Sequence, residues 1–341
     1  QFPKDLYTKI IENKRIEDVL DIDGEIIEGL PIKRNDNIKA SVTIMNGCNN
    51  FCSYCIVPYV RGRERSRNPE DVLNEVKDLA KQGYKEITLL GQNVNSYLKS
   101  GNIDFESHSE EYKNIKSFAE LLRAVNKIDG IERIRFVSPH PKDFTDDVIE
   151  AIRDCEKVCK IIHLPLQSGS TEVLKVMNRK YTKEQYLNLV EKMKAKIPNL
   201  TLSTDIIVGF AGETEEDYRQ TLSLMEEVGY EFAFMFKYSE RPGTFAQRNL
   251  GDDIPDEVKT ARLTEIINLQ NRLSEQSNKR DVGKEFEVLV EGTSKRREDQ
   301  LFGRTSQNKV VVFDKGNHKV GDYVRCRITG CSSATLFGEE I

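Results

Sequence analysis

Several things are missing from this sequence of 341 residues, and each absence excludes a class of protein. No apolar run reaches the roughly 18 residues that a membrane-spanning helix needs, and the first ten residues, QFPKDLYTKI, are too polar for a signal peptide. The seven cysteines do not form the paired framework of a secreted domain. With a net charge of −5, the chain is not expected to bind nucleic acid through its overall charge. These absences predict a cytoplasmic protein that does not bind membranes.

The first part of the chain also lacks an initiator methionine, a long apolar periodicity and any cysteine before Cys48. Residues 1–40 are charged and are predicted to be a linker or a peripheral segment. The missing methionine leads us to expect a fragment of a longer protein.

From Ser41 onward, apolar runs alternate with segments of helical periodicity. One helix is well marked, with Asn68 as its N-cap, Pro69 at its first position and Gly83 after its end. Strands that alternate with helices form parallel βαβ units, whose buried strands are apolar almost throughout. Residues 41–278 are therefore predicted to form an α/β domain, either an open doubly wound sheet or a partial barrel. The predicted strands are 41–46, 85–91, 132–138, 160–167, 200–210 and 231–239.

The pattern of apolar and polar residues changes after a long predicted helix at 257–278. Short alternating runs follow Gly283, separated by turn residues, and this pattern is typical of a small all-β barrel. We place a domain boundary near residue 279, so that residues 279–341 form the second domain.

The stretch GCNNFCSYC places Cys48, Cys52 and Cys55 in a C-x3-C-x2-C pattern directly after the first strand. A structural zinc ion takes four ligands, usually in two pairs, but no fourth Cys or His lies beside these three. The later candidates, His108 and His140, have no such spacing. Three thiolates can instead hold a [4Fe–4S] cluster that keeps one iron open for a substrate. This cluster is the favoured interpretation, with zinc and buried or reactive thiols as alternatives. The other four cysteines are expected to pack as small apolar residues: Cys155, Cys159, Cys326 and Cys331.

The three cysteines, with the aromatic Tyr54 before the last of them, resemble the signature of the radical S-adenosylmethionine (SAM) superfamily. The resemblance continues through IVPYVRGRERSR, LLGQNVNSY, HLPLQSGS, DIIVGFAGET and FKYSERPGT. Over residues 41–341 the chain is similar to the methylthiotransferases of that superfamily, most of all to the MiaB-type tRNA enzymes. The last domain resembles their TRAM domain, an RNA-binding module.

This resemblance implies a fold and a reaction. The fold is a partial (β/α)6 barrel followed by a small all-β TRAM barrel. SAM binds the open iron and is cleaved by one electron to a 5′-deoxyadenosyl radical. The enzymes add a methylthio group to carbon 2 of an isopentenylated adenosine beside the tRNA anticodon. The implied partners are the anticodon stem-loop of tRNA and an electron donor such as flavodoxin or ferredoxin, and the chain is expected to be a monomer.

The chain departs from the family in one respect. The family carries an N-terminal domain with three more cysteines, which hold a second [4Fe–4S] cluster that donates sulfur. No cysteine precedes Cys48 here. The second cluster is therefore expected only in the full-length protein, and this chain alone is not expected to insert sulfur.

Candidate SAM contacts follow the ends of the predicted strands, where both kinds of α/β fold bind ligands. Gly91 would let a ligand approach the backbone, Gln167 and Ser168 could contact the ribose, and Gly209 and Phe210 could border the adenine. A tight turn at Gly91 and a purely structural Asp205 remain alternatives, and His163 is expected to be a core histidine rather than a base. The complete set is Tyr54, Gly91, Gln92, Gln167, Ser168, Asp205, Gly209 and Phe210.

Basic residues form two candidate RNA-binding segments. RGRERSR follows the cysteine loop directly, and arginine is suited to bidentate contact with phosphate or with the SAM carboxylate, although a solvated face is the alternative. Residues 283–341 hold ten Lys and Arg against nine Asp and Glu, so the second domain is not basic overall. Within it, Phe302 could stack on a base. The candidate residues are Arg61, Arg63, Arg65, Arg67, Arg241, Lys295, Arg296, Arg297, Phe302 and Arg304.

Three rival functions remain open. The chain could methylthiolate threonylcarbamoyl-adenosine in tRNA or an aspartate of a ribosomal protein, or it could be an RNA-binding protein stabilised by zinc. The segments GQNVNSY and VPYVRGRERSR resemble the isopentenyl-adenosine enzymes most and favour that substrate.

Overall fold

The computed structural model describes residues 26, 28–29, 32–34, 36–101 and 109–341. The chain divides into two compact units, Gln1–Pro31 and Ile32–Ile341, and every element named below belongs to the second. The predicted peripheral segment 1–40 lies largely outside the described residues, and so does His108.

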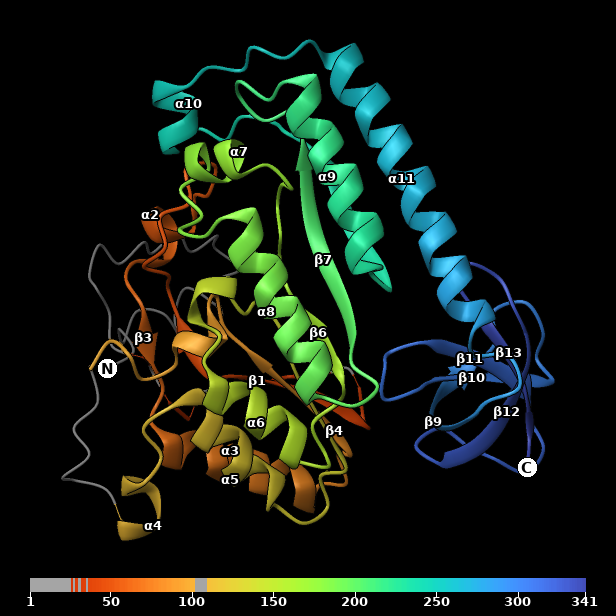
Figure 1. Ribbon diagram of the computed structural model, residues 1–341. Helices are drawn as coiled ribbons and strands as arrows, with labels where there is room; N and C mark the ends of the chain where they lie inside the picture. Colours follow the sequence, from red (N-terminus) through yellow and green to blue (C-terminus); the bar gives the residue numbers. More distant parts are fainter. Residues whose placement is uncertain (1–25, 27, 30–31, 35, 102–108) are drawn as a thin grey trace, which may run out of the picture. The chain divides into compact units, whose positions relative to one another are not determined.

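Six parallel strands form two three-stranded sheets, in the orders β1-β4-β5 and β6-β7-β8. An isolated parallel bridge between Ile134 and Val158 links the two sheets. Helices follow the strands, as the alternation in the sequence predicts (Figure 1). The predicted α/β class with a partial barrel is confirmed. The strands are β1 (Lys39–Thr43), β4 (Glu86–Leu90), β5 (Arg133–Phe136), β6 (Ile161–His163), β7 (Thr201–Val208) and β8 (Phe232–Lys237), with a short antiparallel pair β2 (Met45–Asn46) and β3 (Arg65–Ser66) beside them.

Capping residues begin several helices, among them the helix that the sequence predicts after Asn68. The Asn68 side chain accepts from the backbone N–H of Glu70 and starts α3, and Thr182 with Gln185 forms a capping box at α8. The helices are α2 (Val57–Arg61), α3 (Pro69–Lys81), α4 (Glu110–Lys113), α5 (Phe118–Asn126), α6 (Asp146–Asp154), α7 (Thr171–Val176), α8 (Lys183–Lys196), α9 (Glu215–Val228), α10 (Phe245–Asn249) and α11 (Asp256–Lys279), with 3-10 turns η1 (Val94–Ser96) and η3 (Pro141–Asp143).

The two faces of the strands have different environments because side chains alternate along a strand. Val42, Ile87 and Ile206 are fully buried in the core beneath the helices. Their neighbours along the strands, such as Ser41 and Thr88, point the opposite way, into the interior of the partial barrel. We call this inner face the lumen.

Five strands at the end of the chain close into a small barrel in the order β10-β11-β13-β12-β9, as predicted. We call it the terminal barrel. Val288, Val311 and Phe313 fill its centre together with Cys326, which is fully buried and packs as an apolar residue. The strands are β9 (Glu285–Thr293), β10 (Gln300–Arg304), β11 (Val310–Asp314), β12 (Tyr323–Cys331) and β13 (Leu336–Glu340).

Two arginines of β5 join the terminal barrel to the strands. Arg133 donates to the carbonyl oxygens of Arg304 (2.7 Å) and Glu287 (3.0 Å). Arg135 donates to those of Ser306 and Thr305, both at 3.0 Å. These four bonds, which we call the barrel joint, place the terminal barrel against the amino end of β5.

A buried lysine adds a second connection to the same barrel. Lys309 pairs with Glu231, just before β8, at 2.8 Å, and also with Asp281 after α11. The terminal barrel therefore contacts the amino ends of strands in both sheets, and the opposite, carboxyl ends remain for a ligand site.

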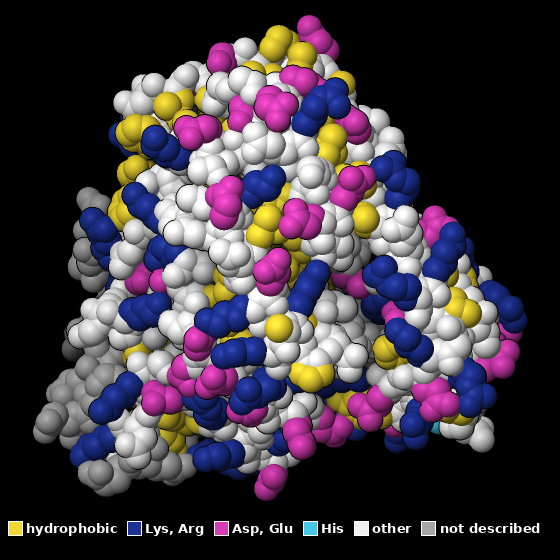
Figure 2. All heavy atoms as spheres, viewed as in Figure 1, with side chains coloured by type: hydrophobic (Ala, Val, Ile, Leu, Met, Phe, Trp, Pro, Cys, Tyr) yellow, Lys and Arg dark blue, Asp and Glu magenta, His cyan; other side chains and the backbone are white. Residues whose placement is uncertain are grey.

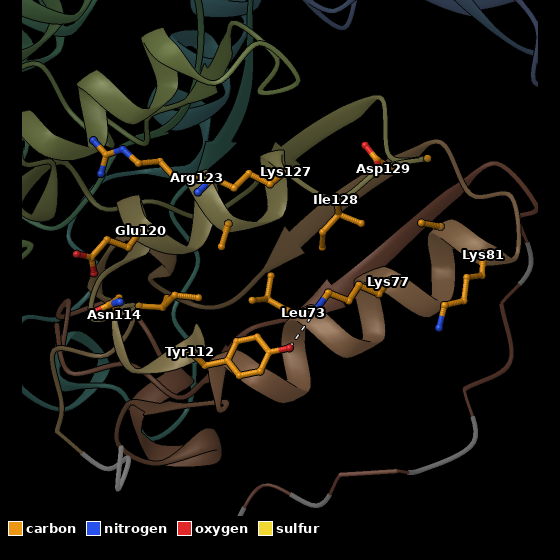
Figure 3. A pocket seen from close by; sticks show the side chains of 14 residues that line it. Leu73, Lys77, Lys81, Tyr112, Asn114, Glu120, Arg123, Lys127, Ile128 and Asp129 are labelled. Atoms are coloured by element: carbon orange, nitrogen blue, oxygen red, sulfur yellow. Dashed lines mark hydrogen bonds between the residues drawn. The ribbon is translucent and has the colours of Figure 1, made fainter. Parts of the chain in front are cut away.

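The outer surface carries charges of both signs. Basic and acidic side chains are interspersed on the face seen in Figure 2, which shows no extended positive field. A hollow of about 1000 Å³ lies between α3 and α5, where Lys77 donates to the Tyr112 hydroxyl (Figure 3), and another of about 1090 Å³ lies between α9 and α11. Neither is lined by a cysteine. No helix of the described residues is both long and apolar enough to cross a bilayer.

Candidate functional site

The three cysteines lie on a loop between β2 and α2, which we call the cysteine loop (residues 47–56). It begins at Gly47, whose φ of +78° suits glycine. A side chain there would collide with the Arg63 carbonyl oxygen, because an added Cβ would lie 2.0 Å from it. The Gly47 N–H donates to Oε1 of Gln92 at 2.7 Å, and the Cys48 N–H donates to the Gly62 carbonyl oxygen. The beginning of the loop is therefore held by its own return segment and by the end of β4.

The middle of the cysteine loop is held by two helices that come much later in the chain. Ser53 donates from its N–H to the Met177 carbonyl oxygen (3.0 Å) and from its hydroxyl to that of Val176 (2.9 Å). Its own carbonyl accepts from the N–H of Ala246 in α10 at 2.7 Å. A buried carboxylate, Glu64, accepts from the N–H of Asn49. The loop therefore has a defined conformation before any cofactor binds.

The thiols lie close together and are shielded from water. Cys48 and Cys52 are buried and Cys55 is half-buried. The pKa of Cys48 is raised to about 11, mainly by burial and to a smaller extent by the nearby Glu64, Cys52 and Cys55. Burial and the neighbouring Cys52 also raise the pKa of Cys55. Without a metal these two thiols are protonated at neutral pH, so binding of a positively charged centre would release protons.

The cysteine loop supplies three thiols, whereas a structural zinc ion takes four protein ligands. Among the described residues, no three His, Cys, Asp or Glu side chains are grouped to hold a single metal ion. A cubane cluster binds its thiolates on separate irons, and three thiolates leave one iron open. The donor set of three cysteines on one braced loop fits such a cluster.

A buried arginine beside the thiols was missed by the sequence analysis. The Arg179 guanidinium donates to Sγ of Cys52 at 3.3 Å and lies 3.5 Å from the Tyr54 hydroxyl. It also donates to the Pro165 carbonyl oxygen (3.0 Å) and the Tyr181 hydroxyl (2.9 Å). A fixed positive charge therefore lies against Cys52 on the buried side of the loop. The segment MNRKYT carries no spacing signal that points to the cysteines, which lie 127 positions away.

Replacing Arg179 by methionine should lower the free energy of unfolding by about 2–4 kcal/mol, because several buried polar groups would lose a charged donor. Chemical denaturation of the chain measures the change. The matched control is Arg153→Met, since Arg153 is exposed and pairs only with Asp154, its neighbour, in the bonds described. That variant should leave the stability almost unchanged, because an exposed ion pair contributes little. Equal losses in both variants would contradict the buried role of Arg179.

Several predicted SAM contacts gather near the carboxyl ends of the strands. Asp205 is half-exposed in the lumen, 3.3 Å from Nε2 of His163, whose Nδ1 lies 3.1 Å from the Ser203 hydroxyl. Both ring nitrogens thus have partners, as expected of a structural histidine. Gln167 pairs with β7 through its main chain. The contacts predicted between SAM and these residues remain predictions.

Gly91 and Gln92 shape the cysteine loop. An added Cβ at Gly91 would lie 2.5 Å from Cγ of Met45, so the close neighbour of this glycine is a side chain of β2. Gln92 accepts from Gly47 as described above. Both residues therefore position the loop, and their contact with SAM likewise remains a prediction.

Three predicted SAM contacts are covered by protein in this structure, and their contact with SAM remains a prediction. The Ser168 side chain is fully buried, 3.5 Å from the Thr221 hydroxyl. Phe210 is fully buried between the rings of Tyr54 and Tyr238, at centroid distances of 6.2 and 4.8 Å. Gly209 is buried beneath the side chain of Lys259. None of the three presents a surface to a ligand, although Phe210 supports the ring of Tyr54.

The arginines of RGRERSR divide into two groups. Arg67 binds the Glu75 carboxylate and the Thr43 carbonyl oxygen, both at 2.7 Å, so its guanidinium is engaged within the fold. Arg65 is half-buried and donates to the Arg61 carbonyl oxygen. Arg61 and Arg63 are exposed beside the cysteine loop.

Another predicted arginine lies near the thiols. Arg241, in the segment between β8 and α10, is exposed and close enough to Cys55 for its charge to act against the increase in the pKa of that thiol. It comes from the end of the α/β domain in sequence, after the last strand, but lies beside the cysteine loop in space. This position suits contact with a bound anion.

The predicted RNA-binding residues of the terminal barrel lie apart from the cysteine loop. Lys295, Arg296 and Arg297 are exposed in the turn between β9 and β10, and Arg297 pairs with Asp299. Phe302 packs over Gly292 and keeps a half-exposed ring. Arg304 is also half-exposed and donates to the Asn308 carbonyl oxygen at 3.0 Å. RNA binding by this group remains a prediction.

Two family models and several curated proteins match this chain. Residues 42–225 match the family model of the radical SAM superfamily, and residues 279–341 match that of the TRAM domain. A tRNA-2-methylthio-N(6)-dimethylallyladenosine synthase from Phocaeicola vulgatus is 60% identical over 306 residues, which are 90% of this chain and 65% of that protein. The protein of the same name from Clostridium botulinum is 52% identical over all of this chain and 72% of its own length.

Among solved structures, coproporphyrinogen III oxidase from Escherichia coli matches with a TM-score of 0.48 and 13% identity, over 86% of this chain and 67% of that one. The chain spans about 65% of the length of several of the relatives it matches, among them the synthases from Phocaeicola vulgatus and Bacteroides fragilis. These longer relatives contain sequence that has no counterpart in the chain.

Proposed function

Since the chain belongs to the radical SAM superfamily, and within it to the family of the tRNA-2-methylthio-N(6)-dimethylallyladenosine synthases, we propose that it contains the SAM-cleaving and RNA-binding parts of such an enzyme. The reaction adds a methylthio group to carbon 2 of N6-dimethylallyladenosine in tRNA. The observation that carries the proposal is the braced cysteine loop at the carboxyl ends of parallel strands, with a buried cation beside it.

The residues of the chain have defined tasks in this proposal. Cys48, Cys52 and Cys55 would hold a [4Fe–4S] cluster, which supplies one electron for the reductive cleavage of SAM. Arg179 offsets the negative charge of the thiolates from the buried side. Arg241 offsets it from the exposed side.

The substrate would reach this site as part of an RNA. The terminal barrel binds the tRNA, which has to place the anticodon loop above the lumen. A one-electron donor such as flavodoxin or ferredoxin, and a location in the cytoplasm, complete the proposal. All seven cysteines are free thiols, as a reducing compartment requires.

Sulfur insertion is assigned to the longer protein. The relatives extend beyond the matched region by about a third of their length, and this is where a second cluster would be bound. The isolated chain should therefore cleave SAM without forming a methylthiolated product.

Metal analysis and a cleavage assay test the proposal together. After anaerobic reconstitution with iron and sulfide, the chain should be brown and contain about four irons. Dithionite and SAM should then yield 5′-deoxyadenosine, measured by liquid chromatography. A colourless protein with one zinc ion, or a brown protein that never cleaves SAM, would contradict the proposed function.

A further inference from the structure

Two phenylalanines of β8 are exposed inside the partial barrel. The side chains of Phe234 and Phe236 have 53% and 54% of their surface accessible. Ala233 and Met235, which alternate with them, pack against the core beneath the helices. Phe234 and Phe236 must therefore face the lumen, because successive side chains of a strand point to opposite faces. Exposed aromatic rings inside a concave site mark a surface that a ligand covers.

Phe234 lies beside polar groups of the candidate site, and Phe236 lies beside an isoleucine. In the parallel register, Phe234 lies beside Asp205 and Phe236 beside Ile207. The Phe234 ring is 5.8 Å from that of His163, which contacts Asp205. β8 is the edge strand of its sheet, so the two rings have neighbouring side chains from β7 on one side and from no strand on the other.

The lumen also contains a polar side, contributed by the other sheet. Ser41 and Thr88 are paired in register, and Thr88 is paired with Arg135. Arg135 binds the Glu86 carboxylate at 3.0 Å in addition to the barrel joint. The lumen thus has hydroxyl and charged groups on the β1-β4-β5 side, and two aromatic rings, beside Asp205 and His163, on the β8 side.

This division matches the two ends of a prenylated adenosine. Its sugar and base edge carry hydrogen-bonding groups, whereas the substituent on N6 is a branched hydrocarbon of five carbons. We propose that Phe234 and Phe236, the β8 aromatic wall, receive this dimethylallyl group and thereby select the substrate. The inference rests on the proposed function and names the part of that site which recognises the substituent.

The aromatic wall also distinguishes this substrate from threonylcarbamoyl-adenosine, one of the alternative substrates. Threonylcarbamoyl-adenosine carries a carboxylate and a hydroxyl group on its N6 substituent. Two phenylalanine rings offer neither a hydrogen bond nor a counter-charge for these groups, so covering them would be unfavourable. The wall therefore favours a hydrocarbon substituent over a charged one.

Binding of two synthetic RNAs tests the inference. Both are the same tRNA anticodon stem-loop, one with adenosine and one with N6-dimethylallyladenosine at the target position. Their dissociation constants are measured by fluorescence anisotropy at one salt concentration, with the reconstituted full chain and SAM present. The chain should prefer the prenylated RNA. In Phe234→Ala and Phe236→Ala this preference should fall on the order of tenfold, the usual effect of lost apolar contact in a pocket.

Two further variants separate recognition from folding. Phe234→Leu keeps an apolar wall and should retain most of the preference. Phe337→Ala removes an exposed phenylalanine from the terminal barrel, at 43% accessible surface, and should leave the ratio of the two dissociation constants unchanged even if it weakens the binding of both RNAs. Affinity for the unmodified RNA should be similar in the three β8 variants, because the wall contacts only the substituent.

The outcomes distinguish this inference from the function on which it rests. An equal affinity of the wild-type chain for both RNAs, or a preference that survives in both alanine variants, would overturn the role of the aromatic wall. Formation of 5′-deoxyadenosine is measured in the same preparations. Its absence from the wild type would contradict the proposed function, whereas its presence with an unaltered RNA preference would contradict only the inference about β8.

Discussion

Replacement of Cys52 by alanine is expected to leave the chain with little iron after reconstitution and to abolish formation of 5′-deoxyadenosine. Cys52 lies between the other two thiols in sequence, is buried, and is the one that Arg179 contacts. Two remaining thiolates would leave a second iron of the cluster without a protein ligand. Iron content, the visible absorbance of the cluster and the yield of 5′-deoxyadenosine measure the loss.

A matched cysteine serves as the control for this experiment. Cys159 is also buried, but it lies at the amino end of β6, away from the cysteine loop. Cys159→Ala should retain the cluster and the cleavage of SAM, with only a small loss of stability. If Cys52→Ala retained wild-type iron content and cleavage, the assignment of the three cysteines as cluster ligands would be wrong.

The second large effect is expected for Gly47→Ala. The new Cβ would lie 2.0 Å from the Arg63 carbonyl oxygen, a group of the backbone that cannot rotate away. The positive φ adds a further penalty. Together these should cost roughly 2–5 kcal/mol of unfolding free energy. Because the loop carries the thiols, the variant should also bind less iron, and urea denaturation with iron analysis measures both effects.

Gly83 separates the two causes of this loss. Its φ is +90°, similar to that of Gly47, but an added Cβ would meet no atom within 4 Å. Gly83→Ala should therefore cost only the conformational penalty of about 1–2 kcal/mol and leave iron binding unchanged. Equal effects on iron in the two variants would show that the collision with Arg63 is not what shapes the loop.

The predictions from sequence succeeded where a local pattern carries the information. Capping residues and apolar runs located the strands and most helices, and the alternation of the two kinds of segment identified the fold class. The cysteine spacing located the candidate site. Each of these signals lies within about twenty neighbouring residues, so no knowledge of the tertiary structure was needed.

The sequence says least about residues whose surroundings depend on the other side of the fold. Phe210 and Ser168 follow strand ends, where ligands usually bind, but the packing of Tyr238 and Thr221 against them covers their side chains. Arg67 belongs to a run of arginines, yet Glu75 in α3 takes up its charge. A run of like charges does not reveal which members meet a partner.

The sequence alone does not reveal the aromatic wall, for a related reason. The segment EFAFMFKYS is apolar on both faces, so periodicity does not distinguish the face beneath the helices from the lumen. Only the register beside β7 and the packing of Ala233 and Met235 show where Phe234 points.

The barrel joint has a consequence for how this family can change over time. Arg133 and Arg135 bind four carbonyl oxygens of the main chain, at Glu287 and at residues 304–306. A carbonyl oxygen is present whatever side chain the residue carries, so substitutions on the terminal barrel leave these bonds in place. Its outer surface can therefore change in sequence while its attachment to the α/β domain stays constant. The two domains can thus stay attached while the side chains of the second domain are replaced.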